Sequence, residues 1–444
     1  MFNSWLRVDG IMYVGVWALL PEMENEGLEK ALNRYREAGF EHIIIPGGVT
    51  DVHPEHYRGT SIDPMKTIAP SEAVYASGAK TRRDVIKAVT DHGLVYDLVV
   101  GVGGQSGLIE KYPHVANTDI FGERSSIMMC LNNPDGRNFI LGQIEDILSH
   151  YDVYGVELDV IYVDHHTRMT VKPDPPPALY PLHHLAPDNC FCEHCMKLAG
   201  EKGLNVEGLR KTVMRLVQAS KKLSYDRFKR YTDTFRGMYD AVRFLLDYPE
   251  LVDWLRFRCD TITQFTADVK DIARGIDPKL VVSVDTLSPS FSWTMGQDYR
   301  SLSKVADHLK LLLFTRCIGA REAKPLRPLM KAIPEASDEE IMDLLYRMWG
   351  FQGPRTLDEF AGGGVDPANT YYQVRCAKEE TGFSYPIVAG IGASESASPE
   401  HVKKGVEMAF KAQADGVCVH TWYGGTDPRS IAAVGEALKE LGIR

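Results

Sequence analysis

Two carboxylates lie two positions apart in the apolar stretch GVELDVIYVD. Glu157 and Asp159 share one face if this stretch is a β-strand, because strand side chains alternate between two faces. A charged group buried without a partner is costly, so the pair predicts either a functional site or a buried ion pair or hydrogen-bond network. We expect Asp159 to act in chemistry. Glu157 is a second catalytic candidate, although its deeper position favours the ion pair or network.

Two more carboxylates follow apolar segments later in the chain. Asp285 ends VVSVD, and Glu395 lies just beyond PIVAGIGA in GASES. Glycoside hydrolysis needs two carboxyl groups flanking one bond, one to donate a proton and one to attack or to activate water. We expect Asp285 to be the acid that partners Asp159, with a pKa raised by burial or by its neighbour. Its alternative role is a hydrogen bond to a loop or to substrate, and Glu395 is a third candidate whose alternative is a helix N-terminal charge.

Aromatic and polar side chains lie near the ends of the same segments. An indole ring can stack on the apolar face of a sugar, and a histidine can hydrogen-bond a hydroxyl group. A core aromatic cluster is the alternative, and a metal site of Asp51, His53 and His56 has no metal-specific framework to support it. The residues that we expect to line a sugar site are Trp17, Asp51, His53, Trp293, His420, Trp422 and Tyr423.

Three cysteines lie within six positions in DNCFCEHCMK, namely Cys190, Cys192 and Cys195. A disulfide would leave one thiol over, and a nucleophilic cysteine needs a base rather than two further thiols. Three thiolates fill three corners of a tetrahedral zinc site, with upstream Cys130 or local His194 as the fourth ligand. We therefore expect a closed structural zinc site, with free thiols as the alternative, and no organic cofactor.

Eight segments rich in Val, Ile and Leu position these residues, and most of them are separated by amphipathic helix. Near-continuous apolar strands are typical of a parallel sheet covered on both faces. Eight such units predict a closed (β/α)8 TIM barrel, in which chemistry lies at the C-terminal ends of the strands. An open doubly wound sheet is the alternative, although no G-x-G-x-x-G follows the first segment. The expected strands are residues 11–17, 42–48, 94–104, 154–163, 279–289, 308–316, 385–393 and 415–425.

The whole chain, 1–444, is predicted to be one barrel with two helical insertions. The first, 164–275, follows strand four and carries the cysteine cluster and long helices, and the second, 317–384, follows strand six. A formal net charge of −10 argues against general binding to nucleic acid or to anionic membrane. Eight cysteines without a signal-peptide pattern indicate the cytoplasm, and no apolar run is long enough for a membrane span. A homo-oligomer is compatible with the sequence.

One region resembles a known group of proteins. The segment MCLNNPDGRNFILGQIEDILSHYDVYGVELDVIYVD, followed by CFCEHCMKLAGEKGLN, is similar to glycosyl-hydrolase-like (β/α)8 barrels with a strand-four Asp and a CxCxxC loop. The cysteines resemble those of glycoside hydrolase family 42, which implies Cys130, Cys190, Cys192 and Cys195 as zinc ligands. The catalytic Asn-Glu pair and strand-seven Glu of that clan have no counterpart here. The resemblance to strand-four-Asp barrels instead favours Asp159 as nucleophile.

These features together predict a glycoside hydrolase that acts on an oligosaccharide or another glycoside. A first alternative is a lyase or isomerase acting on a sugar or sugar acid, with His420 or Glu157 as proton shuttle. A second alternative is a barrel that binds carbohydrate without catalysis. All three hypotheses predict that the protein binds a carbohydrate.

Overall fold

Eight parallel strands close into a barrel in the computed structural model of the chain. Their order around the barrel is β1-β10-β9-β8-β7-β6-β3-β2. The predicted (β/α)8 barrel is confirmed, and the open doubly wound sheet is excluded. The structure describes residues 12–46, 54–63, 81–159, 161, 189–220, 222, 224–234, 238–393, 397–420 and 427–443. The barrel strands are β1 (Tyr13–Trp17), β2 (His42–Pro46), β3 (Val95–Gly101), β6 (Gly155–Asp159), β7 (Val281–Thr286), β8 (His308–Leu312), β9 (Ile387–Gly392) and β10 (Gly416–His420).

The strands are apolar on the side that meets the helices and mixed on the side that faces the barrel interior. In β6, for example, Val156 and Leu158 belong to the main hydrophobic core, while Glu157 between them points inward. Glycines let neighbouring strands approach where a side chain would collide. A Cβ on Gly155 would lie 2.0 Å from the carbonyl oxygen of Val281. Gly155 therefore permits the close approach of β6 and β7.

A small antiparallel sheet interrupts the alternation of strands and helices after β3. It consists of β4 (Ala116–Thr118) and β5 (Arg124–Met129), and it follows α4 (Ser106–Lys111) and the 3-10 helix η2 (Pro113–Val115). Its strands carry few of the Val and Ile residues that mark the barrel strands, so apolar content gave no signal for it.

Helices that follow most barrel strands cover the outside of the barrel. Several of them begin at a residue whose side chain caps the helix. Thr81 accepts a hydrogen bond from the backbone N–H of Asp84, and Asp84 returns one, as a capping box requires. Among the described residues these helices are α1 (Leu20–Glu26), α2 (Leu28–Glu37), α3 (Arg82–Asp91), α5 (Pro134–His150), α17 (Pro399–Lys411) and α18 (Pro428–Glu440).

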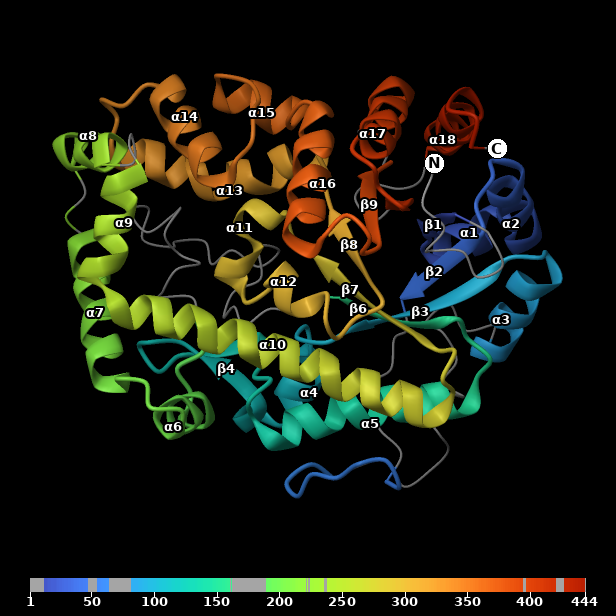
Figure 1. The fold of residues 1–444 in the computed structure, drawn as a ribbon, viewed down its shortest axis with the longest axis horizontal. Coiled ribbons are helices and arrows are strands. Elements are labelled where there is room, and N and C mark those ends of the chain that lie inside the picture. The colour runs from blue at the N-terminus through green and yellow to red at the C-terminus, as the bar shows by residue number, and fades with distance from the viewer. Residues whose placement is uncertain are drawn as a thin grey trace.

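Two longer helical segments follow β6 and β8, and a short one follows β7. Figure 1 shows α7 to α9 at the left of the view, α13 to α15 across the top, and the long α10 beneath, where it packs on α5. The description of 164–275 and 317–384 as insertions into one barrel stays a prediction. No helix among the described residues has the length and apolar character that crossing a membrane requires. The helices are α6 (Glu193–Glu201), α7 (Val206–Ser220), α8 (Tyr225–Thr234), α9 (Met238–Asp247), α10 (Pro249–Ile276), α11 (Pro289–Ser292), η4 (Trp293–Met295), α12 (Tyr299–Leu302), α13 (Cys317–Ala332), α14 (Asp338–Trp349), α15 (Leu357–Gly363) and α16 (Ala368–Thr381).

Candidate active site

A buried lysine joins two carboxylates inside the barrel. The Nζ atom of Lys310 on β8 lies 2.5 Å from Oε1 of Glu157 on β6 and 2.8 Å from Oδ1 of Asp285 on β7. All three side chains are at most 2% exposed. Glu157 therefore has the buried ion pair that the sequence indicated as its alternative role.

Strand register explains why these three side chains meet. Asp285 and Lys310 are direct neighbours across β7 and β8, and Glu157 lies opposite Ser283 on β7. Because Ser283 and Asp285 are two positions apart, both face the interior. Two adjacent strand pairs thus bring one ammonium group and two carboxyl groups to the same level of the barrel.

Burial controls the charge states in this network. It raises the pKa of Asp285 well above its ordinary value, and repulsion from Glu157 raises that pKa further. Attraction from Asp285 and Glu157 outweighs burial at Lys310 and raises the pKa of its ammonium group. Lys310 therefore stays charged, while Asp285 is the group most ready to keep a proton.

Asp159 lies above this network at the C-terminal end of β6. It is half-buried, whereas Asp285 is buried, and its register partner on β3 is Gly101, which has no side chain to cover it. The negative charge of Asp159 is among the causes that raise the pKa of Asp285. The two carboxyl groups that were predicted to act together therefore interact electrostatically near one end of the barrel.

Aromatic rings pack beside the network. The indole N–H of Trp17 donates to Oε1 of Glu157 at 2.6 Å, and Lys310 Nζ lies 4.8 Å from the centre of the Trp17 ring. His420 is the register partner of Trp17, with ring centres 4.3 Å apart, and it also contacts Phe314 at 4.5 Å. Burial, followed by the charge of Lys310, lowers the pKa of His420 well below its ordinary value. His420 is therefore a neutral imidazole, and Trp17 supports Glu157.

Of the remaining predicted sugar-lining and catalytic residues, the described one, Trp293, does not belong to this buried network. Trp293 lies in η4 after β7 and is 39% exposed, so its indole is available to a ligand. Asp51, His53, Glu395, Trp422 and Tyr423 lie outside the described residues. Their roles stay predictions.

A second polar layer lies nearer the N-terminal ends of the strands, and the sequence argument missed it. Tyr13 donates to Asp97 Oδ2 at 2.9 Å, and His42 Nδ1 lies 3.1 Å from the same oxygen. His308 is buried near the Tyr13 ring, and burial lowers the pKa of its imidazole to about 4. This layer fills the floor of the barrel beneath Glu157 and Lys310.

Lys310 was also missed, although the sequence contains a signal for it. In HLKLLLF a lysine and a histidine occupy alternate positions of an otherwise apolar strand. Such a lysine faces the interior if the strand is in a barrel, and a buried cation needs carboxylate partners. The inward-facing carboxyl groups of Glu157 and Asp285 are the partners that such a lysine would need.

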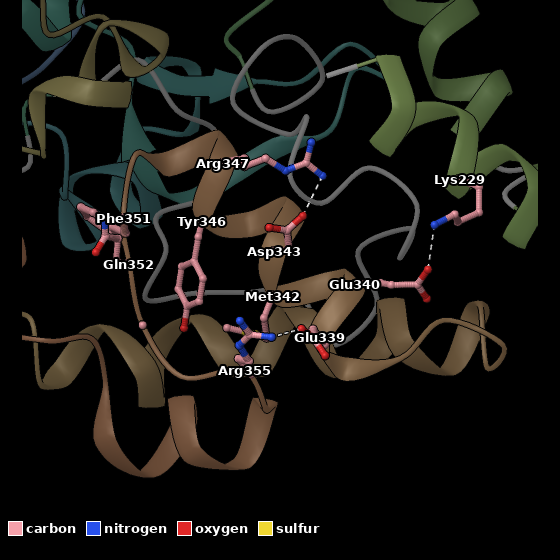
Figure 2. Close-up of a pocket in the computed structure, with 11 residues that line it drawn as sticks. Lys229, Glu339, Glu340, Met342, Asp343, Tyr346, Arg347, Phe351, Gln352 and Arg355 are labelled. Carbon is pink, nitrogen blue, oxygen red and sulfur yellow. Dashed lines mark hydrogen bonds and ion pairs between the residues drawn. The ribbon is translucent and has the colours of Figure 1, made fainter. Parts of the chain in front are cut away.

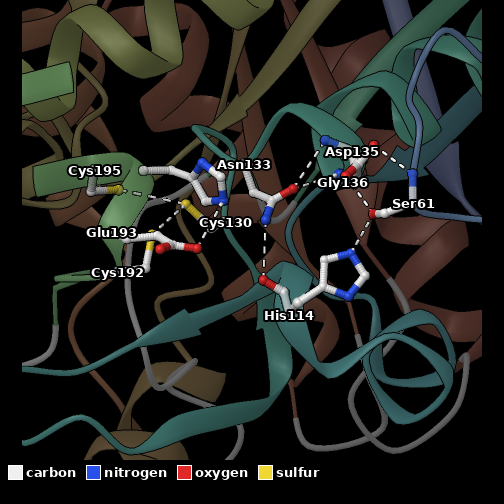
Figure 3. Close-up of polar contacts among 10 residues, drawn as sticks. Ser61, His114, Cys130, Asn133, Asp135, Gly136, Cys192, Glu193 and Cys195 are labelled. Carbon is white, nitrogen blue, oxygen red and sulfur yellow. Dashed lines mark hydrogen bonds and ion pairs between the residues drawn. The ribbon is translucent and has the colours of Figure 1, made fainter. Parts of the chain in front are cut away.

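The four cysteines meet on the barrel's flank, between the small antiparallel sheet and α6. Their sulfur atoms lie within 4.8 Å of one another, and Cys130 Sγ is 3.5 Å from the sulfurs of both Cys192 and Cys195. Figure 3 shows Cys130, Cys192 and Cys195 pointing toward one another. Four thiolates at about 2.3 Å from one zinc ion would be about 3.7 Å apart, so this arrangement fits a tetrahedral zinc site. His194, the other candidate ligand, is not among this group.

A cavity of about 790 Å³ lies among the helices that follow β6 and β8. It is lined by α8, α14 and the segment after α14, and none of its lining residues belongs to a barrel strand. Figure 2 shows three ion pairs there, Lys229–Glu340, Arg347–Asp343 and Arg355–Glu339. Because its charges are already paired with one another, this cavity gives no evidence of catalysis.

Comparison with solved structures places the barrel among known folds. A β-galactosidase from the Antarctic haloarchaeon Halorubrum lacusprofundi matches with a TM-score of 0.58 and 13% identity, over 97% of this chain and 58% of that one. A glycoside hydrolase family 42 β-galactosidase from G. stearothermophilus matches at 0.53 and 11%, over 97% and 57%. The chain shares the closed (β/α)8 barrel fold of these proteins. The catalytic domain of a β-amylase from Paenibacillus polymyxa also matches, with a TM-score of 0.53 and 11% identity, over 97% of this chain and 99% of that one.

These likenesses concern the fold alone, because the identities are low. This chain spans less than three fifths of the length of the two β-galactosidases. No family model matches the sequence. No curated protein matches it either.

Proposed function

We propose that this barrel hydrolyses a glycosidic bond, with Asp159 as nucleophile or base and Asp285 as acid. One observation carries the proposal: two carboxyl groups on neighbouring strands interact near the C-terminal end of a closed barrel, and their environments differ. Asp159 is half-buried, while Asp285 is buried with a raised pKa. Two carboxyl groups whose environments separate their pKa values are suited to acid and base roles.

The other described residues have supporting roles in this mechanism. Lys310 neutralises the charge of Glu157 and limits the total negative charge that Asp159 meets. Trp17 fixes Glu157 through its indole N–H, so the network keeps one geometry. Trp293, whose indole is exposed beyond β7, is the aromatic surface that we assign to sugar binding. Trp422, Tyr423, Asp51 and His53 remain proposed sugar contacts.

The test compares Asp159→Asn with wild type on a panel of aryl glycosides and oligosaccharides. We expect the amide to lower kcat/KM on the order of 10³-fold, because it can neither attack nor take a proton. Asp152→Asn is the matched control, since Asp152 is exposed and precedes the same strand. Equal turnover by Asp159→Asn and wild type would overturn the assignment.

The role of Asp285 has its own test. A general acid is needed most when the leaving group is a poor one. Asp285→Asn should therefore lose far more activity on alkyl glycosides than on nitrophenyl glycosides. Equal losses on both substrate types would contradict the acid role while leaving that of Asp159 intact.

A second candidate function is a sugar lyase or isomerase on the same strand ends. The buried Lys310 ammonium favours it, because a fixed positive charge can stabilise an enediolate formed by proton removal. The neutral imidazole of His420 or the carboxylate of Glu157 would move the proton. Exchange of substrate C–H for solvent deuterium would support this candidate and count against hydrolysis.

We also propose that Cys130, Cys190, Cys192 and Cys195 hold a structural zinc ion. The clustering of four sulfur atoms supports this, and four protein ligands would leave no open position for catalysis. Zinc would fix α6 to the end of β5 and would take no part in the reaction.

A further inference from the structure

A second group of potential metal ligands lies between α5 and segment 54–63. It consists of His56, Asp146 and His150, whose ligand atoms all lie within 4.8 Å of one another. His56 Nε2 is 3.7 Å from Asp146 Oδ1, and His150 Nδ1 is 3.2 Å from the same oxygen. The three residues come from α5 and from the segment 54–63, neither of which forms a barrel strand.

The backbone brings these side chains together without help from a ligand. Asp146 and His150 are four positions apart on α5, so they share one face of the helix. Segment 54–63 is held along the same helix at two other points. Tyr57 donates to Asp135 Oδ1 at 3.0 Å, and Arg58 donates to Glu145 Oε1 at 2.9 Å. These contacts of Tyr57 and Arg58 hold the backbone of His56 beside the helix.

Both imidazoles have a carbonyl or carboxylate oxygen beside Nδ1. His150 Nδ1 lies 2.7 Å from the backbone oxygen of Asp146 and donates to it, so Nε2 carries the lone pair. His56 Nδ1 faces Glu145 Oε2 at 3.7 Å, while its Nε2 faces Asp146. Metal-binding histidines commonly direct their second nitrogen to a carbonyl or carboxylate in this way. Arg58 forms an ion pair with Glu145, and this pairing limits the repulsion between the Arg58 guanidinium group and a bound cation.

We propose that His56, Asp146 and His150 bind one divalent cation of the zinc class. Two imidazoles and one carboxylate are ligands that zinc accepts, and three protein ligands leave a fourth position for water. The side chain of Asp146 is fully buried and that of His56 is 18% exposed, so the ion would be partly shielded. The bound ion joins segment 54–63 to α5.

The test counts zinc ions per chain in the full-length protein by mass spectrometry after zinc loading and gel filtration. The double variant H56Q/H150Q should hold one zinc fewer than wild type, whatever the four cysteines bind. His92→Gln is the matched control, because His92 makes the same bond, from Nδ1 to the carbonyl of Ala88, at the end of α3. It should hold as much zinc as wild type.

A second measurement separates the two sites. The variant C192S/C195S should keep the ion at His56, and a mercurial reagent should release no zinc from it. Circular dichroism of H56Q/H150Q should match that of wild type, since His150 is 43% exposed. Equal zinc content in wild type and H56Q/H150Q would overturn the proposal and would show a metal-free cluster of charged and hydrogen-bonded groups.

Discussion

Lys310 determines the charge balance inside the barrel. Its ammonium group lies between Glu157 and Asp285, and all three side chains are buried. Taking three charged groups out of water is expensive, so each must be compensated by the others. Without Lys310, two carboxyl groups would face each other in a buried site, and both would need to be protonated.

We expect Lys310→Met to lower the free energy of unfolding by about 3–5 kcal/mol, because it leaves buried carboxylates without their cation. Urea unfolding measures the change, and Lys304→Met is the control, since Lys304 is exposed. Adding Glu157→Gln to Lys310→Met should restore part of the loss. If the double variant is less stable by the full sum of both single changes, the two groups are not coupled.

His308 predicts how stability depends on pH. The pKa of its imidazole is lowered from 6.5 to about 4, so the unfolded chain binds a proton between these values and the folded chain does not. Stability therefore falls as pH drops from 6.5 to 4, by about 3 kcal/mol from this group. His308→Leu should show a shallower fall in urea unfolding across that range. An unchanged slope would contradict a buried neutral imidazole.

At the scale of single residues, the sequence predicts which side chains face inward but not which ones touch. Alternation identified Glu157 and Asp159 on one face of their strand. The contact between Lys310 and two carboxylates depends on the register of three strands, which no local pattern encodes. The same reason explains why the layer of Tyr13, Asp97 and His308 was missed.

Among the elements, α5 connects the proposed structural sites. Its N-cap Asn133 accepts hydrogen bonds from the backbone N–H groups of Asp135 and Gly136 at 3.0 and 3.1 Å. The Asn133 side chain also donates to the carbonyl of His114 at 3.1 Å, as Figure 3 shows. Asn133 lies three residues after Cys130. Asp135, in the first turn of the same helix, accepts hydrogen bonds from segment 54–63. One cap thus supports both sides of the helix.

We expect Asn133→Ala to lower the free energy of unfolding by about 1–2 kcal/mol, because it removes the cap and a buried hydrogen bond. Asn138→Ala is the control on the same helix, since its side chain donates only to the carbonyl of Pro134 among the described contacts. Chemical unfolding monitored by circular dichroism measures both. Equal losses of unfolding free energy in the two variants would show that the capping contacts of Asn133 do not add to stability.

Elements with a strong apolar pattern could be predicted, and those without one could not. All eight barrel strands were expected within a few residues of their observed bounds, because each is buried on both faces. The helix α1 was missed because it is short and has Pro21 in its first turn, which reads as a break. The pair β4 and β5 has no alternation to reveal it.

For the molecule as a whole, the cysteine cluster joins the helices after β6 to the barrel's flank. Cys130 follows β5, while Cys192 occupies the N-cap position of α6 and Cys195 lies within that helix. The surrounding apolar residues come from α7 and α10 as well, including Trp254. Loss of the proposed zinc ion would therefore loosen these helices together.

We expect removal of zinc by a chelator under reducing conditions to lower the unfolding temperature by several degrees. Readdition of zinc should restore it, and C192S/C195S should show neither change. Differential scanning fluorimetry gives the measurement. An unfolding temperature that is the same with and without chelator would contradict a structural metal at the four cysteines.

The central claim is that Asp159 and Asp285 cleave a glycosidic bond with water. The most direct measurement incubates the protein with glycosides in ¹⁸O-labelled water and weighs the products by mass spectrometry. We predict one ¹⁸O atom in the sugar product for each bond that wild type or Asp152→Asn cleaves, and almost no product from Asp159→Asn. Products without ¹⁸O, or equal labelled product from Asp159→Asn, would contradict the claim.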